Sequence, residues 1–242
     1  MVDYVSCFLQ PSRSKLSYND MIHLDNLSKH FPTRRGKKVI VQNLTATFPT
    51  GESVALLGRN GAGKSTLLKL IAGTIRPTSG RVLSTGTISY PVGFQGSFHP
   101  DLTGIQNTRF VARLYGMDSD DLVAFVEDFA ELGPHFRMPL RTYSAGMKSR
   151  LSFGVSMGIP FDTYLVDEVT SVGDGAFRHK SVQVFDKRNE TAGAIVVTHS
   201  PPMVRRLCSM AAVLEKGHLQ FYSDLEAALD HHEYNLSLPP ER

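Results

Sequence analysis

The residues with the clearest chemistry lie in one glycine-rich stretch, "GRNGAGKST", at positions 58–66. It fits the pattern G-x-x-x-x-G-K-[ST], in which glycines let successive backbone N–H groups turn inward around phosphate oxygens. Lys64 would reach the β- and γ-phosphates of a nucleotide, and the Ser65 hydroxyl would ligate Mg²⁺. The predicted phosphate-binding residues are Gly58, Arg59, Asn60, Gly61, Ala62, Gly63, Lys64, Ser65 and Thr66.

Two acidic residues and a histidine follow apolar runs that are typical of buried strands. Asp167 and Glu168 end "TYLVDE", and His199 follows the run in "VVTHS". Because α/β sheets bind ligands beyond the carboxyl ends of their strands, we expect these side chains near the phosphates. Asp167 would hold Mg²⁺ through water, Glu168 would polarise a water molecule toward the γ-phosphate, and His199 would reach the γ-phosphate and that water. An acidic strand end alone would carry little weight, but the glycine-rich stretch upstream favours a catalytic role.

A second glycine-containing turn, "YSAGM", precedes a helical run at position 143 onward. Ser144 and the backbone N–H groups near Gly146 lie at a helix N-terminus, which is a favourable place for an anion. The glycine-rich stretch already encloses one side of a triphosphate, so we expect this second turn to serve a nucleotide bound by another copy of the chain. The alternative is an ordinary capped helix. The chain carries no N/T-K-x-D guanine-binding motif, which argues against a GTPase.

The surrounding pattern predicts an α/β fold. Residues 53–58 form a short run that is apolar on both faces, which is typical of a central strand. Residues 162–168 and 194–198 are two more buried-strand candidates, 211–223 read as strand, turn and strand, and 225–234 as a closing helix. Strands that alternate with helices favour a largely parallel sheet with crossover helices.

Three regions depart from that alternation. Residues 21–31 are strand-like, and 43–48 alternate apolar and polar residues as a half-exposed strand does. The pattern of residues 96–158 is helical and predicts a helical subdomain inserted into the core. The polar, aperiodic residues 1–20 are expected to be a disordered extension. The expected division is 1–20 as extension, 21–235 as one cassette with its helical subdomain at about 96–158, and 236–242 as a tail.

Composition excludes several classes of protein. The chain has 242 residues, 41% of them apolar, and a net charge of +3. Its apolar runs are far shorter than the roughly 18–20 residues that a membrane-spanning helix needs. Two cysteines form neither a disulfide framework nor a zinc motif. The basic residues at 34–38 lack interleaved aromatic residues, so a solvated hairpin loop is expected there and no nucleic-acid partner.

Taken in order, these motifs resemble those of the ATP-binding subunits of ABC transporters: "GRNGAGKST", "YSAGM", "YLVDE", "SVGD" and "THS". The resemblance implies an ABC-type P-loop NTPase fold with an inserted helical subdomain and an antiparallel β portion. It also implies that Phe31 stacks on adenine and that Asp174 bridges two subunits. The residues that would contact the partner's ATP are Ser144, Ala145 and Gly146. A glutamine should touch both magnesium and the permease; Gln95 is the candidate, although His99 occupies the place where closer relatives have glutamine.

The pattern is closer still to the subunits that export capsular and related surface polysaccharides. Their "YSAGMK-x-RL" matches residues 143–151, and their "DEV-x-x-VGD-x-x-F-x-x-K" matches 167–180. The resemblance implies an ATPase that uses ATP and Mg²⁺, forms an ATP-dependent head-to-tail homodimer, and drives integral-membrane permease subunits from the cytoplasmic face of the inner membrane.

Three alternatives stay open: an importer subunit, a non-transport ABC ATPase, and a scaffold that does not hydrolyse ATP. No direct polysaccharide binding is expected, because the chain has no tryptophan and no room after His199 for a sugar-binding domain.

Overall fold

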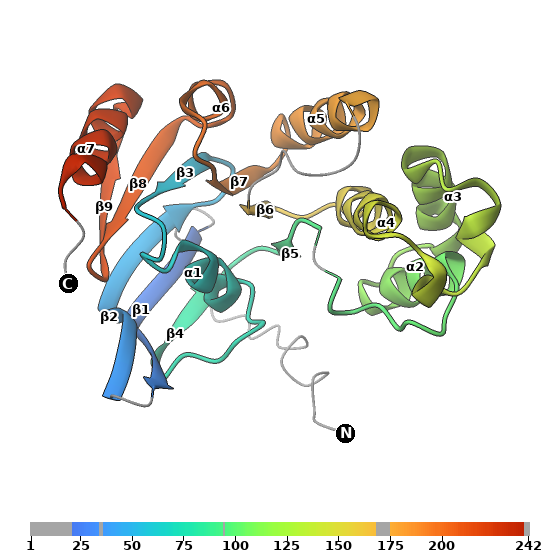
Figure 1. Ribbon diagram of the computed structural model, residues 1–242, viewed down its shortest axis with the longest axis horizontal. Coiled ribbons are helices and arrows are strands. Elements are labelled where there is room, and N and C mark those ends of the chain that lie inside the picture. Colours follow the sequence, from blue (N-terminus) through green and yellow to red (C-terminus); the bar gives the residue numbers. More distant parts are fainter. Residues whose placement is uncertain (1–20, 34–35, 94, 168–174, 240–242) are drawn as a thin grey trace.

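The protein is described by a computed structural model, which covers residues 21–33, 36–93, 95–167 and 175–239. The expected extension at 1–20 lies outside the described residues. Two sheets and seven α-helices are described in these ranges. The sheets and α7 lie on one side of the molecule in Figure 1, and helices α2 and α3 lie on the other.

The larger sheet has the strand order β5-β6-β7-β3-β8-β9. All neighbours are parallel except β8 and β9, which form an antiparallel hairpin. The strand bounds are β3 Ser53–Leu57, β5 Ile88–Pro91, β6 Thr163–Asp167, β7 Gly193–Val197, β8 Met210–Glu215 and β9 His218–Tyr222. Every residue of β3 is buried, so its predicted central position is confirmed. The parallel α/β architecture is confirmed as well.

The smaller sheet is antiparallel, with β1 (Met21–Thr33) between β2 (Gly36–Pro49) and β4 (Ser79–Ser84). In β2 the predicted alternation holds, with Leu44 and Phe48 buried. The strand begins earlier than predicted, because Gly36 pairs with Thr33 and the hairpin ladder continues from there. Lys37 and Lys38 therefore belong to a strand, and the predicted hairpin loop is wrong for these two residues. The sequence did not predict β4, most of whose residues are exposed, or the short β5.

The helices separate into two groups. Helices α1 (Lys64–Ile71), α5 (Gly175–Asn189), α6 (Pro201–Leu207) and α7 (Leu225–Ser237) belong to the region of the sheets. Helices α2 (Gly104–Leu114), α3 (Ser119–Ala130) and α4 (Ala145–Gly158), with the 3₁₀ turns η1 (Gly133–Arg137) and η2 (Leu140–Thr142), follow one another without a strand among the described residues. The chain between β5 and β6 is therefore a helical insertion into the sheet region (Figure 1).

The two faces of the larger sheet bury different partners, as the period of a strand requires. Val54 and Leu56 of β3 pack in a cluster with α1 and the smaller sheet. Ala55 and Leu57 face the opposite cluster, which includes residues of α2 to α7. Both faces are covered, which explains why the parallel strands are apolar throughout.

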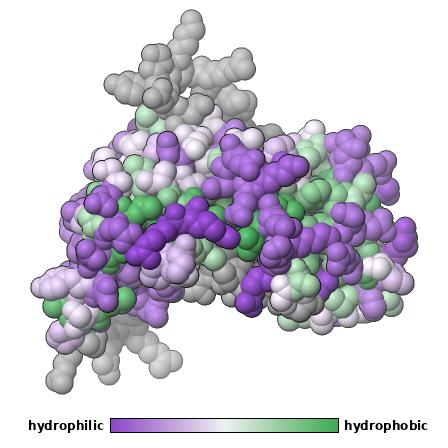
Figure 2. Space-filling model, turned by 90° about the horizontal axis from the view of Figure 1, so that it is seen from above, coloured by the Kyte–Doolittle hydropathy of each residue, from purple (hydrophilic) through white to green (hydrophobic). Residues whose placement is uncertain are grey.

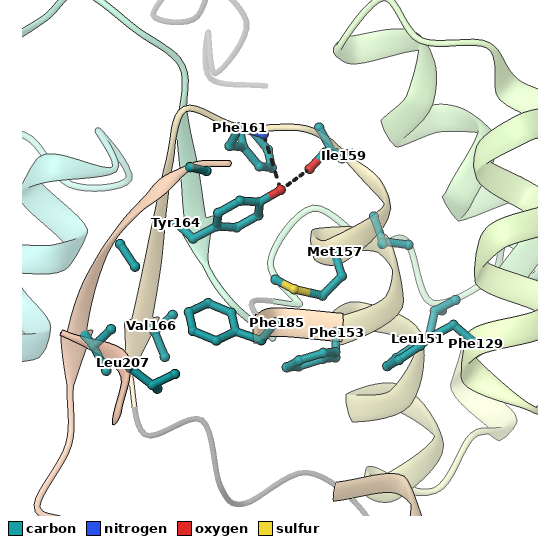
Figure 3. Close-up of a cluster of buried hydrophobic side chains, with 14 of the residues drawn as sticks. Phe129, Leu151, Phe153, Met157, Ile159, Phe161, Tyr164, Val166, Phe185 and Leu207 are labelled. Atoms are coloured by element: carbon teal, nitrogen blue, oxygen red, sulfur yellow. Dashed lines mark hydrogen bonds between the residues drawn. The ribbon is translucent and has the colours of Figure 1, made fainter. Parts of the chain in front are cut away.

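Helix α4 joins the helical insertion to the sheet. Figure 3 shows Phe153 and Met157 of α4 beside Tyr164 and Val166 of β6 and Phe185 of α5. The Tyr164 hydroxyl donates to the Ile159 carbonyl at 2.8 Å and accepts from the Phe161 N–H at 3.3 Å. This packing fixes β6, which carries Asp167 at its end.

A cluster of cations and aromatic rings joins α3, α4 and α5. The Arg150 guanidinium lies 4.6 Å from the centre of the Phe177 ring, and that ring lies edge-on to Phe129 at 5.1 Å. The Lys180 ammonium lies 5.4 Å from the Phe129 ring and donates to Glu131 Oε1 at 2.7 Å. Each cation–π contact contributes about 0.5–2 kcal/mol. The "F-x-x-K" part of the sequence pattern thus holds the helical insertion against α5.

Hydrophilic and hydrophobic side chains are interspersed on the face shown in Figure 2, where the hydrophobic areas are small and separated. Within the described part of the chain, no helix combines the length and the apolar character that crossing a membrane requires.

Candidate nucleotide-binding site

The glycine-rich loop connects β3 to α1, as the motif requires. The backbone conformation and the close packing of this loop both require its glycines. Gly58, Gly61 and Gly63 have φ angles of +150°, +84° and +104°, which favour glycine. A Cβ atom on Gly58 would lie 2.5 Å from the Leu214 carbonyl oxygen, and one on Gly63 would lie 2.5 Å from Cγ2 of Ile40. Any larger residue at either position would displace β8 or β2.

A cavity of about 490 Å³ opens over this loop. Its lining residues are Lys38, Ile40, Asn60, Gly61, Gly63, Lys64, Ser65, Thr66, Asp167, Val197 and His199. Six of the nine predicted loop residues line it, together with Asp167 from the end of β6 and His199 from just beyond β7. The register of the sheet explains this, because Asp167 pairs with Val197 in parallel and the two strands therefore end together.

Lys64 lies at the start of α1 and is only 7% exposed. Its ammonium donates to the carbonyl of Gly58 at 2.6 Å and to that of Arg59 at 3.1 Å. A buried charge needs such acceptors, because burial without them would cost several kcal/mol, on the order of 2–7 even for an uncharged polar group. The loop therefore holds the Lys64 charge at the edge of the cavity.

The two side chains at the strand ends differ in their surroundings. Asp167 is half-buried, whereas His199 is exposed. The turn between β7 and α6, which carries His199, is held by Thr198, whose buried hydroxyl accepts from the Ser200 N–H at 3.2 Å. Glu168 and Asp174 lie outside the described residues.

The sequence reasoning missed three lining residues: Lys38, Ile40 and Val197. Lys38 and Ile40 are two apart on β2, so they share one face of that strand. The apolar run at 39–41 was the available signal for a strand, but nothing in it indicates that β2 passes over the glycine-rich loop. Contact between Ile40 and the site of a Cβ on Gly63 establishes that arrangement.

Phe31 and Gln95 do not line the described cavity. Phe31 is 39% exposed, the Lys29 ammonium lies 4.9 Å from its ring, and its Cα pairs across the ladder with that of Lys38. Gln95 is exposed, and its carbonyl accepts from the Phe98 N–H at 3.1 Å.

His99, the other candidate at that junction, is also absent from the cavity lining. Its backbone is held by Asn107, a fully buried residue of α2. The Asn107 side chain accepts from the His99 N–H at 2.8 Å and donates to the His99 carbonyl at 3.1 Å. Asn107 therefore fixes the segment that precedes α2, a structural role that the sequence did not predict.

The second predicted anion-binding turn begins α4. Ser144 caps this helix, since its hydroxyl accepts from the Met147 N–H at 3.2 Å. Ser144, Ala145 and Gly146 are all exposed and lie outside the cavity lining. The preceding Tyr143 is buried and donates to the His135 carbonyl at 2.7 Å, and its burial raises the pKa of the phenol. Hydrogen bonds thus hold this turn in place, while its residues 144–146 stay exposed to solvent.

Comparison with known proteins places these features in a family context. The sequence profile of the ABC transporter family matches residues 41–171. A polysialic acid transport ATP-binding protein, KpsT of Escherichia coli, is 44% identical over 88% of this chain and 96% of its own length. The capsule polysaccharide export ATP-binding protein CtrD of Neisseria meningitidis is 43% identical over 90% of this chain and 100% of its own. The O-antigen export ATP-binding protein RfbB of Klebsiella pneumoniae is 36% identical over 83% of each chain.

Solved structures share the fold. The dimeric ATP-binding cassette MJ0796 bound to ADP and phosphate aligns with a TM-score of 0.69 and 23% identity, over 83% of this chain and 97% of its own. An ATP-binding subunit of an ABC transporter aligns with a TM-score of 0.74 and 20% identity, over 90% of this chain and 100% of its own.

Proposed function

Since this chain belongs to the ABC transporter family, we propose that it is the ATP-hydrolysing subunit of an exporter of capsular or related surface polysaccharide. The observation that carries the enzymatic part is the convergence of Lys64, Ser65, Asp167 and His199 on one cavity from three separate segments. The cargo is inferred from the relatives, which match nearly their whole length and are named for polysialic acid transport and capsule polysaccharide export.

The donor groups in the cavity suit ATP with Mg²⁺. Ser65 offers a hydroxyl and Asp167 a carboxylate, and hard oxygen ligands of this kind are those that Mg²⁺ prefers. We assign the ion to these two residues; when bound, it would neutralise charge on the phosphate oxygens. Lys64 and the loop N–H groups orient the phosphates, and catalysis consists mainly of positioning and charge stabilisation.

Three further assignments follow from the resemblance. Glu168 orients and polarises the attacking water, His199 contacts the γ-phosphate from the end of β7, and Asp174 bridges two subunits. Phe31 is the proposed platform for adenine, since it is exposed beside Lys38, which lines the cavity. The contact of Gln95 with magnesium and the permease stays a prediction without geometric support here.

In a head-to-tail homodimer, the start of α4 would contact the nucleotide bound by the partner copy. A Cβ atom on Gly146 would meet only the Ser144 hydroxyl oxygen, at 3.9 Å. The φ angle of Gly146 is not positive either. Nothing in the described chain therefore requires glycine at this position. A nucleotide held by a partner copy, approaching the exposed backbone N–H groups, would require it.

The proposal also places the subunit peripherally at the cytoplasmic face of the inner membrane, bound to separate permease subunits. The test is deletion of the gene for this chain in the cells that produce it. Surface polysaccharide should disappear and polymer should accumulate inside; the wild-type chain should restore export, and Lys64→Ala should not. Unchanged surface polysaccharide, with ATP hydrolysis by the purified chain intact, would show that the cargo is another compound. An ATPase subunit of a different ABC transporter is the alternative that this outcome would favour.

A further inference from the structure

Arg59 belongs to the glycine-rich loop, yet its side chain turns away from the cavity. Its Nη1 atom donates to the carbonyl oxygens of Asn235 and Leu238, at 2.8 Å each. These carbonyls lie at the C-terminal end of α7, where a helix leaves its last acceptors without intrahelical donors and carries partial negative charge. A guanidinium is a suitable partner for such carbonyls, and charge-assisted hydrogen bonds are stronger than neutral ones.

The backbone of Arg59 also supports Lys64. The Arg59 carbonyl accepts from the Lys64 ammonium at 3.1 Å, beside the Gly58 carbonyl at 2.6 Å. The Gly58 backbone in turn lies against the Leu214 carbonyl of β8, so closely that a Cβ would not fit. The first turn of the loop is therefore held by β8 on one side and by α7 on the other.

The end of α7 is itself fixed in place by a polar network. Asn235 is 4% exposed, and its side-chain amide donates to Glu215 Oε2 at 2.8 Å and lies 3.0 Å from His231 Nε2. His231 Nδ1 lies 2.7 Å from the Tyr222 hydroxyl. Glu215 ends β8 and Tyr222 ends β9, so this network ties α7 to the hairpin of the larger sheet.

A second buried polar residue of α7 is His232. It is 8% exposed, and within the described residues its Nδ1 atom has no hydrogen-bond partner. Burial lowers the pKa of this histidine, and the charges of Lys64, His199 and His231 lower it further. Lys64 and His199 both line the nucleotide cavity, so the electrostatic influence of that cavity extends to α7.

We propose that α7 braces the phosphate-binding loop through Arg59, and that Arg59 is a positioning residue for ATP binding. The inference rests on the proposed ATPase function and deepens it. Without the Arg59 side chain, the first turn of the loop gains freedom that ATP binding must remove again, so affinity falls. The reacting groups lie on the cavity side and keep their geometry once ATP is bound.

The test compares steady-state ATP hydrolysis by the full chain and by three variants. Arg59→Ala should raise KM for ATP about five- to tenfold while kcat stays within about twofold, because only binding is weakened. Arg59→Lys, which keeps a cation that can reach the carbonyls, should recover most of the loss. Arg81→Ala is the matched control, since Arg81 pairs with Asp25 at the surface of the smaller sheet. It should behave as the wild type does.

Binding of a fluorescent ATP analogue to the same proteins separates the possible failures. A wild-type chain that neither binds nor hydrolyses ATP would overturn the proposed function. If the wild type is active, an unchanged KM in Arg59→Ala would overturn the proposed role of Arg59 alone, whether or not kcat falls. Should Arg59→Ala fail to fold, Arg59→Gln carries the same comparison, with the same raised KM expected.

Discussion

Helices α1 and α4 begin at the two glycine-containing turns that the sequence pointed out, and the two turns differ in why they contain glycine. At α1, Gly58 and Gly63 have positive φ angles and no space for a side chain. At α4, Gly146 has neither constraint, and its surroundings leave room for a Cβ atom. The fold explains the glycines of the first region, whereas nothing in the described chain explains Gly146, for which we proposed a contact with a partner's nucleotide.

The same difference holds for the groups around each helix start. The start of α1 lies at a cavity that β2, β6 and the end of β7 also line. The start of α4 is exposed, and Ser144 serves as its cap. The first region is thus part of a cavity lined by several segments of the chain. The second is an exposed turn that does not line this cavity. Five substitutions test whether this difference has a functional meaning.

The largest effect is expected from Lys64→Ala in the first region. Removing the ammonium takes away the charge that orients the phosphates, so ATP turnover should fall by at least about a hundredfold. Thermal stabilisation of the protein by added ATP should disappear with it. Both are measured on the purified chain, and hydrolysis near the wild-type level would contradict the assignment of this cavity.

Glu168→Gln should separate binding from hydrolysis. An amide keeps the shape of the carboxylate but cannot polarise water in the same way, so turnover should fall about 10²–10³-fold. ATP should still bind, and gel filtration with ATP should show a persistent dimer. A monomer with near-normal hydrolysis would exclude the proposed role of Glu168.

Gly146→Leu tests the second region directly. Leucine favours helices, and its Cβ atom would meet no close neighbour at this exposed position, so the midpoint of thermal unfolding should stay near the wild-type value. ATP-dependent dimerisation and turnover should fall at least about tenfold, since the side chain would occupy the space of the partner's nucleotide.

The matched substitution in the first region is Gly63→Ala, which should lower the free energy of unfolding because of its φ of +104° and its contact with Ile40. If Gly146→Leu dimerises and hydrolyses ATP normally, the start of α4 does not face a nucleotide, and the contrast between the two helix starts loses its functional meaning.

The smallest effect is expected from Tyr143→Phe. It removes the hydrogen bond to the His135 carbonyl that helps to hold the turn before α4, and leaves the ring in its buried place. The free energy of unfolding should fall by about 1 kcal/mol, as chemical denaturation would measure. Turnover should change little, and a loss as large as that of Gly146→Leu would mean that Tyr143 does more than support the turn.

The local parts of this structure followed from the sequence. The loop at 58–66 lies between β3 and α1 as its motif requires, and the apolar runs ending at Asp167 and Val197 form neighbouring strands. The reason is physical: glycine spacing sets backbone conformation over a few residues, and parallel strands deliver their carboxyl ends to one edge. The largely exposed β4 escaped prediction, because a strand at the edge of a sheet needs no apolar alternation.

The sequence was sufficient to identify the family, the glycine-rich loop at 58–66, and Asp167 and His199, which share a cavity with that loop. Tertiary structure alone decided which way the long side chains turn. Lys38 lines the cavity because β2 crosses above the loop, and Arg59 leaves the cavity because α7 offers it two carbonyls. The spacing of a motif predicts its backbone conformation, but the direction of a long, charged side chain depends on where its hydrogen-bond acceptors lie. The acceptors of Arg59 lie 176 and 179 residues away in the chain.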